Sequence, residues 1–242
     1  PTRGERSEFW PVEEVIARGF GIAAIQNNQL APDDSARFRE GVIELFEGSA
    51  SGPRSRDAWA ALAAWGWGAS RAMDYFQTDP DVDVSRVAVL GHSRGGKAAL
   101  WAGAEDPRFS LVISNESGAG GAALSRRRYG ETVERITSSF PHWFAPRFTD
   151  FAGREDELPI DQHQLVALMA PRAVYVASAD EDLWADPRGE FLSMVHGSPV
   201  FALWGNARVG EGEMPGLERP AHFGRLGYHV RRGGHNLTLY DW

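Results

Sequence analysis

One serine, at the junction of two predicted elements, restricts the folds open to this chain more than any other feature. Residues 86–90 are rich in valine and predict a short buried strand, whereas residues 97–104 have the apolar spacing of a helix. Between them, residues 91–95 read Gly-His-Ser-Arg-Gly. We expect a tight turn here, because side chains at Gly91 and Gly95 would collide with neighbouring backbone. The pattern therefore predicts a strand–turn–helix unit with Ser93 exposed at the turn.

The order of the other predicted elements indicates an α/β fold. Further strands are predicted at residues 20–26, 111–114, 174–178 and 199–204. Helices are predicted at residues 10–17, 33–46 and 59–76, a mostly helical insertion around residues 118–171 and a glycine-rich loop at residues 205–227. Alternating strands and helices predict a mostly parallel sheet that is buried on both faces. The length of 242 residues suits one domain over residues 1–242.

The setting of Ser93 is that of the nucleophile in a serine hydrolase. In α/β-hydrolases a G-x-S-x-G run follows a strand and opens a helix, which holds the hydroxyl clear of the sheet. The amino terminus of that helix favours developing negative charge. Such a serine needs a general base and a group that orients the base, and in this fold the chain order is serine, acid, histidine.

Histidine and acidic residues after Ser93 supply the candidate partners. Among the seven histidines, His235 is the preferred base, because it follows the last predicted strand in a flexible Gly-Gly-His-Asn run. His222 and His229 are the competing candidates. The acid is either Glu116, which follows the strand at residues 111–114, or Asp182, which follows the strand at residues 174–178. Chain order does not distinguish these two carboxylates.

Composition excludes several other classes of protein. With 25 basic and 33 acidic residues, the net charge of −8 does not favour nucleic acid. The chain has no cysteine, which excludes disulfides, thiolate catalysis and cysteine-bound zinc. No apolar run approaches the roughly 18 residues of a membrane span, and no dinucleotide, Walker or H-E-x-x-H motif is present. We therefore expect no metal, no organic cofactor, no nucleic acid and no membrane partner.

Several runs of sequence resemble the glucuronoyl esterases, carbohydrate esterase family 15, and the bacterial members most. The resemblance covers nearly the whole chain, and its matching runs lie at residues 91–97 (GHSRGGK), 115–121 (NESGAGG), 140–144 (FPHWF), 158–163 (LPIDQH) and 181–187 (EDLWADP). The resemblance implies an α/β-hydrolase fold, for which about five strands are few. We therefore expect either a small sheet or a chain that lacks the N-terminal part of the fold.

The resemblance also assigns catalytic roles. This family cleaves esters of glucuronic or 4-O-methylglucuronic acid with alcohols, as in lignin–xylan cross-links. The family match would make Ser93 the nucleophile and His235 the base. Glu116 matches the usual position of the acid, and Asp182 matches an alternative position in some bacterial members.

The same resemblance points to substrate contacts. Arg94 would stabilise the oxyanion, Lys97 and Glu131 would hold sugar hydroxyls, and Trp184 would form a wall of the sugar site. Lys97 is the one lysine among the 25 basic residues, and its compact ammonium is not equivalent to a guanidinium.

The substrate implied by the family is glucuronoxylan esterified to lignin, which lies outside the cell. We therefore expect a secreted or periplasmic protein, acting as a monomer. Two alternatives remain: another carbohydrate esterase of the acetyl-xylan or feruloyl type, or a non-catalytic carbohydrate-binding relative. Recognition of a uronate should depend on Lys97 and Glu131, whereas cleavage of a simple acetate should not.

Overall fold

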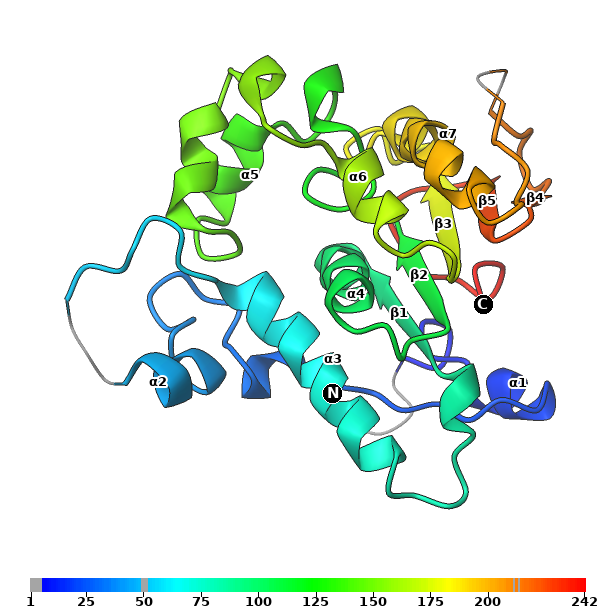
Figure 1. Cartoon of the computed structure of the whole chain (residues 1–242), viewed down its shortest axis with the longest axis horizontal. Coiled ribbons are helices and arrows are strands. Elements are labelled where there is room, and N and C mark those ends of the chain that lie inside the picture. Colours follow the sequence, from blue (N-terminus) through cyan, green and yellow to red (C-terminus); the bar gives the residue numbers. More distant parts are fainter. Residues whose placement is uncertain (1–5, 49–51, 211, 213) are drawn as a thin grey trace.

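A computed structural model describes residues 6–48, 52–210, 212 and 214–242. In this part of the chain, five strands form one sheet in the order β1-β2-β3-β5-β4 (Figure 1). They are β1 (Ala88–His92), β2 (Leu111–Asn115), β3 (Ala173–Ala179), β4 (Ala221–Phe223) and β5 (Leu226–Arg231). Strands β1, β2, β3 and β5 are parallel, and β4 pairs with β5 antiparallel. The predicted α/β class with a mostly parallel sheet is confirmed.

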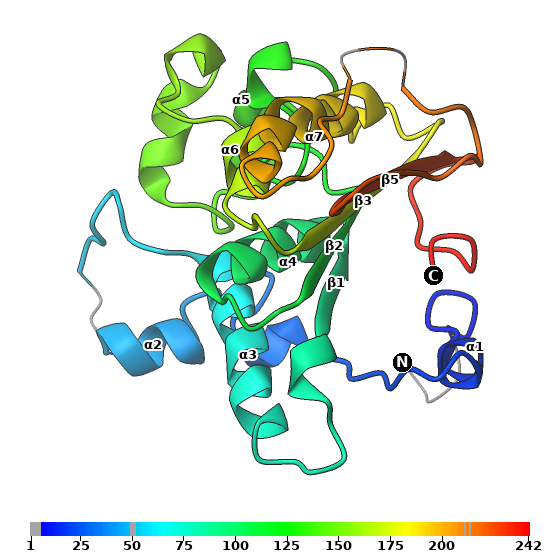
Figure 2. The same cartoon turned by 45° about the vertical axis from the view of Figure 1, so that its right-hand side comes forward.

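Helices cover one face of this sheet. The α-helices are α1 (Val12–Ala17), α2 (Val42–Glu47), α3 (Ala61–Phe76), α4 (Arg94–Glu105), α5 (Val133–Ser139), α6 (Gln162–Ala167) and α7 (Pro187–Ala202). Short 3-10 helices are η1 (Asn27–Gln29), η2 (Val84–Arg86), η3 (Ser125–Arg127), η4 (Pro146–Phe151) and η5 (Glu155–Glu157). Helix α4 packs against β1 and β2, α7 packs against β3 and β5, and α3 and α6 lie outside them. Figure 2 shows α1 and the C-terminal residues on the other side of the sheet.

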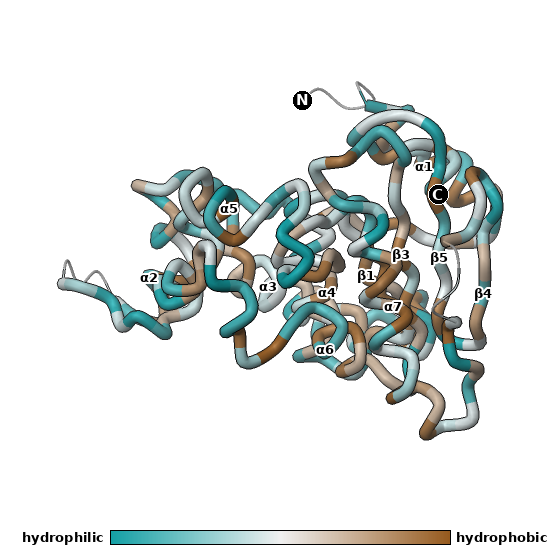
Figure 3. The backbone as a smooth tube through the Cα atoms, turned by 90° about the horizontal axis from the view of Figure 1, so that it is seen from above, coloured by the Kyte–Doolittle hydropathy of each residue, from teal (hydrophilic) through white to brown (hydrophobic). Residues whose placement is uncertain are grey.

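The hydrophobic core lies between the sheet and helices α4 and α7. Val112, Val176 and Tyr228 project from three neighbouring strands into this layer, where they meet Phe191 and Met194 of α7. Fully burying one such side chain contributes about 1.5–3 kcal/mol. On the opposite face Ile113 and Tyr175 are only half-buried, whereas His229 and Arg231 of β5 are buried, so the expected burial of both faces is met at β5 and only in part at β2 and β3. In the hydropathy view, hydrophobic residues lie along β1, β3 and α4 (Figure 3).

Two predicted strands are wrong. Residues 20–26 are not a strand, and Phe20 is 58% exposed; this apolar run has no neighbouring strand to pair with among the described residues. Residues 199–204 begin inside α7. Phe191, Met194, Ser198 and Phe201 are buried at helical spacing, and this periodicity was missed because the final apolar stretch looks continuous.

Other boundaries also differ from the sequence-based prediction. The predicted helix at residues 33–46 is reduced to α2, and turns occupy most of its first half. The predicted loop at residues 205–227 contains β4 and the start of β5. The strand before Ser93, β1, and the helix after it, α4, lie within a few residues of their predicted positions.

The turn between β1 and α4 depends on glycine, although not at both predicted positions. A Cβ atom at Gly91 would overlap the carbonyl oxygen of Gly95, whereas one at Gly95 would meet nothing within 4 Å. The second close approach is at Gly96, where a Cβ would lie 2.9 Å from the Cβ of Ser117. The prediction for Gly95 is therefore wrong, and the close packing falls one residue later.

No helix in the described part of the chain combines the length and the apolar character that crossing a membrane requires.

Candidate active site

A cavity of about 210 Å³ lies at the carboxyl edge of the parallel sheet. Ser93 follows β1, Glu116 follows β2, Asp182 follows β3 and His235 follows β5, so one topology brings four distant segments to one edge. The cavity is lined by Ser93, Arg94, Lys97, Glu116, Ser117, Gly118, Glu131, Phe140, Trp143, Trp184, Ala185 and His235. Seven of the eight residues singled out from the sequence line it, and the eighth, Asp182, bonds to His235.

Ser93 occupies a strained position at the head of α4. Its φ of 57° lies in the left-handed region, which a non-glycine residue adopts only when its surroundings require it. The backbone N–H of Ser93 donates to the carbonyl of Asn115 at 2.8 Å, which ties the turn to the end of β2. The first N–H groups of a helix have no acceptor within it, so the amino end of α4 offers donors beside the hydroxyl.

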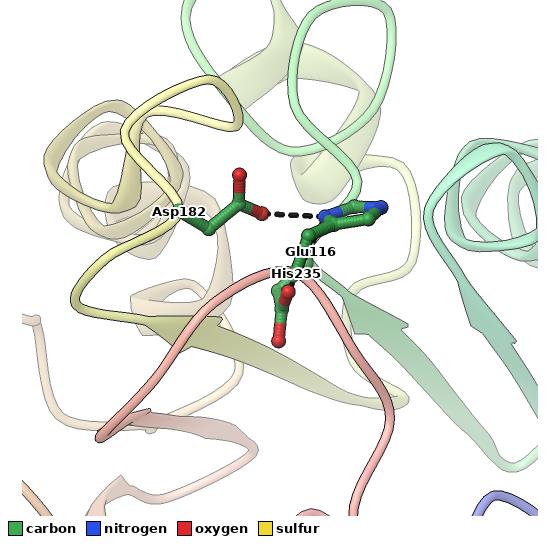
Figure 4. Close-up of side chains that lie close together, drawn as sticks. All are labelled: Glu116, Asp182 and His235. Atoms are coloured by element: carbon green, nitrogen blue, oxygen red, sulfur yellow. Dashed lines mark hydrogen bonds and ion pairs between the residues drawn. The ribbon is translucent and has the colours of Figure 1, made fainter.

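His235 is held by two carboxylates on the same ring nitrogen. Its Nδ1 lies 2.6 Å from Oδ2 of Asp182, the contact drawn as a dashed line in Figure 4. The same nitrogen lies 3.3 Å from Oε2 of Glu116. Two acceptors at Nδ1 assign the proton of the neutral ring to that atom and leave Nε2 able to accept one. The hydrogen bond to Asp182, followed by that to Glu116, raises the pKa of His235 to about 9.

The two carboxylates differ in their surroundings. Burial alone would raise the pKa of Asp182, but the hydrogen bond and the charge of His235, together with the backbone N–H of Ala185 and a hydrogen bond with Glu116, outweigh burial, and the pKa is lowered. Burial raises the pKa of Glu116 to about 7, against the opposing effects of His235, Arg231 and the backbone N–H of Asn236. Asp182 is thus the closer and more readily ionised partner of His235.

Arg94 stands beside Ser93 with its guanidinium fixed from two sides. It forms an ion pair with Asp33, and it lies over the rings of Trp143 and Phe140 at 4.8 and 5.4 Å. Asp33 also accepts from Nε1 of Trp143 at 2.7 Å. Such cation–π contacts reduce the freedom of a long side chain, so the positive charge is kept at the cavity.

Lys97 and Glu131 form a buried ion pair in the wall of the cavity. The Nζ atom of Lys97 lies 2.8 Å from Oε2 of Glu131 and also donates to the carbonyls of Ser117 and Ala119 at 2.5 and 2.8 Å. These three bonds use all three donors of the ammonium. Trp184 donates from Nε1 to the other oxygen of Glu131 at 3.1 Å. The three residues therefore form one connected polar wall.

Sequence reasoning missed four residues of this site. Phe140 and Trp143 stack at 3.9 Å in the cavity wall, and the run at residues 140–144 was noted only as a matching motif. Asp33 pairs with Arg94, and Arg231 pairs with Glu116 at 2.5 Å. No local pattern marks these two, since each meets its partner only through the tertiary fold.

The donor set of Glu116, Asp182 and His235 could hold a cation by distance alone, since one ligand atom from each lies within 4.8 Å of the others. However, Nδ1 of His235 already shares a proton with Asp182, and Glu116 pairs with a guanidinium. These partners satisfy the group as a hydrogen-bonded triad, and the predicted absence of a metal remains a prediction.

Comparison with known proteins identifies the family. A family model described as "Glucuronyl esterase, fungi" matches residues 12–205. Carbohydrate esterase MZ0003 from an unknown prokaryotic organism is 47% identical over 241 residues, which cover 100% of this chain and 55% of that protein. The 4-O-methyl-glucuronoyl methylesterase of Schizophyllum commune is 33% identical over 224 residues, which cover 85% of this chain and 55% of the relative.

A solved structure agrees with this result. The glucuronoyl esterase from Solibacter usitatus superposes with a TM-score of 0.94 at 48% identity, over 100% of this chain and 61% of its own. The fold is therefore that of an α/β-hydrolase. Within that class, the chain belongs to the glucuronyl esterase family, as its resemblance predicts. It spans little more than half the length of the two curated relatives.

Proposed function

We propose that this chain carries the catalytic site of a serine esterase that hydrolyses esters of glucuronic or 4-O-methylglucuronic acid. The observation that carries the proposal is the short bond between His235 and Asp182 at a cavity that Ser93 also lines. The family relationship and the curated name of the Schizophyllum commune relative support the choice of substrate.

In this mechanism Nε2 of His235 takes the proton of the Ser93 hydroxyl while Oγ attacks the ester carbonyl. The tetrahedral intermediate collapses, His235 returns the proton to the leaving alcohol, and the glucuronoyl group remains on Ser93. A water molecule then repeats the sequence, with His235 again as base, and releases the acid. Asp182 orients the ring and stabilises its charged form, with Glu116 as the weaker second partner.

Arg94 supports the anionic intermediate. The ester carboxyl is neutral in the substrate, so a fixed guanidinium favours the intermediate over the ground state. The backbone N–H of Arg94, the residue after the nucleophile, is the second donor. Losing one such donor typically costs about 2.7–4 kcal/mol of transition-state stabilisation.

The sugar ring would lie against Trp184 and Glu131. Because Lys97 already uses three donors, we propose that it acts on the sugar mainly by holding Glu131 and by sharing one of its bonds. The indole of Trp184 is half-exposed and offers an apolar face to the ring.

We further propose that the chain forms a single catalytic domain over residues 1–242. The helical insertion around residues 118–171 would be the wall that supplies Glu131, Phe140 and Trp143. The protein would act as a monomer, outside the cytoplasm, on ester-linked glucuronoxylan.

The test compares benzyl glucuronate with 4-nitrophenyl acetate as substrates of the unmodified chain and of Lys97→Met. We expect cleavage of the glucuronate ester, lost in the variant, with the acetate affected far less. Cleavage of the acetate alone would favour the acetyl-xylan type of esterase, and sugar binding without any turnover would favour a non-catalytic relative.

A further inference from the structure

Arg231 lies at the end of β5, four residues before His235, and each of the three nitrogens of its buried guanidinium donates at least one hydrogen bond. Nη2 donates to the carbonyl oxygens of Gly234 and Asn236 at 3.2 and 2.5 Å. Nη1 donates to its neighbouring carbonyl, at residue 232, at 2.9 Å. The two residues on either side of His235 are thus fastened to one planar group.

The same guanidinium meets the second carboxylate of the site. Nη2 lies 2.5 Å from Oε1 of Glu116, while the other oxygen, Oε2, accepts from the backbone N–H of Asn236 at 3.0 Å. Glu116 is almost completely buried, and a buried carboxylate needs a charged or hydrogen-bonding partner. Arg231 supplies that charge. Arg231 and Glu116 each form hydrogen bonds with the backbone of the loop that carries His235.

Asp241 restrains Arg231 through the Nε side of its guanidinium. Its Oδ2 accepts from Nε of Arg231 and from the backbone N–H of Thr238, both at 2.8 Å. Its Oδ1 meets Nε2 of His229 at 2.9 Å and Nδ2 of Asn115 at 3.1 Å. Residues from β2, β5 and the C-terminal segment therefore meet at one carboxylate, which leaves the guanidinium little freedom to turn.

The backbone around His235 needs these hydrogen bonds to hold its position. Gly233 has a φ of 101°, and with Gly234 it forms a flexible approach to His235. The histidine side chain is itself 41% exposed, and its ring packs against one neighbouring ring, that of His92, at 4.5 Å between centroids, so packing restrains it on one side. The backbone bonds from Arg231 and Glu116 hold the loop where Asp182 can reach the ring.

We propose that Arg231 is a positioning residue of this site. It holds the carbonyls on both sides of His235 and neutralises Glu116, so that the imidazole is presented to Asp182 and Ser93. This inference rests on the proposed function of Ser93 and His235 as nucleophile and base, but it does not depend on which ester is cleaved.

The experiment compares the unmodified chain, Arg231→Met and a matched control, Arg172→Met. Arg172 also donates to three backbone carbonyls, at residues 103, 106 and 109, but at the opposite edge of the sheet from the site. Two rates are measured for each: turnover of benzyl glucuronate, and labelling of Ser93 by a fluorophosphonate. Labelling requires the Ser93–His235 arrangement without requiring uronate recognition, so failure of the proposed substrate and failure of the role of Arg231 give different results.

For Arg231→Met we expect kcat and the labelling rate to fall about 100-fold, the effect typical of a catalytic group displaced by about 1 Å. KM should change less than about threefold, because the sugar wall is untouched. Arg172→Met should change both rates little once the remaining folded fraction is measured by circular dichroism. Rates for Arg231→Met equal to those of the control would overturn the proposal.

Two further variants keep the test decisive. Arg231→Lys retains the charge but not the planar fork, so the labelling rate should stay at least about tenfold below the unmodified chain; full recovery would overturn the role in holding the two carbonyls. Should Arg231→Met fail to fold, Asp241→Asn serves instead. It keeps the Arg231 guanidinium but removes the charged carboxylate that restrains it. This variant should also lower the labelling rate at unchanged KM, and an unchanged labelling rate would contradict the proposal.

Discussion

Replacing Asp182 with asparagine removes the charge closest to His235 and tests which carboxylate is the acid. The side chain keeps its size, so the cavity and the loop after β3 should retain their shape. What is lost is the 2.6 Å charged contact with Nδ1. Glu116 remains at 3.3 Å from the same atom, so His235 keeps one orienting acceptor.

The magnitude follows from the pKa of His235. A rise from 6.5 to about 9 would correspond to about 3 kcal/mol in a site fully shielded from water. Because 41% of the side chain is exposed, solvent screening leaves about half of this, and Asp182 accounts for the larger share. Asp182→Asn should therefore cost about 1 kcal/mol of imidazolium stabilisation, or roughly five- to tenfold in kcat.

The double variant Asp182→Asn with Glu116→Gln should lose far more than the product of the two single losses. A catalytic histidine with no carboxylate at Nδ1 typically loses on the order of 10⁴ in kcat, because nothing then fixes its tautomer. The assay is hydrolysis of benzyl glucuronate across pH, with Asp180→Asn as the control. Asp180 is in the same loop and accepts from the backbone of Gly233, a bond that asparagine can keep.

This reasoning would be refuted if Asp182→Asn behaved like the unmodified chain while Glu116→Gln alone abolished turnover. The acid would then be Glu116, and the shorter distance to Asp182 would have no catalytic meaning. A fall in the pKa that governs kcat/KM should accompany Asp182→Asn, since the raised value depends first on that residue.

Three other outcomes follow from the same geometry. The rate kcat/KM should rise with pH between about 6.5 and 9, because His235 must lose its proton to act as base and its neighbours raise its pKa; a flat profile over that range would contradict the raised value. Gly91→Ala should yield little folded protein in a circular-dichroism melt, since a Cβ there overlaps the backbone at Gly95, and a normal melting temperature would count against the tight turn. Phe191→Ala should lower the free energy of unfolding, measured by urea titration, by about 3–5 kcal/mol, because the ring is buried in the main core. A loss below about 1 kcal/mol would mean that the core is less well packed than described.

The parts of this protein that could be predicted from sequence are those with a local physical cause. The turn at Ser93 was predictable because valine-rich, glycine-rich and helical segments follow one another within about twenty residues. The loop position of His235 was predictable from its flanking glycines and its place after the last strand.

The parts that could not be predicted depend on tertiary contacts or on pattern ambiguity. The run at residues 199–204 is apolar enough for a strand, yet its phase continues the buried face of α7. The choice between Glu116 and Asp182 depends on distances of 3.3 and 2.6 Å across two loops, which chain order does not encode. Arg231 is one arginine among 24, and only the fold places it against Glu116.

The most direct test of the central claim is turnover of benzyl glucuronate by Ser93→Ala. The substitution removes one oxygen atom from a half-buried side chain that lines the cavity, so the melting temperature should stay close to that of the unmodified chain. If Ser93 is the nucleophile, the unmodified chain releases benzyl alcohol and glucuronate and the folded variant releases neither above background. Near-normal turnover by the folded variant would contradict the assignment of Ser93, and with it the mechanism built on His235 and Asp182.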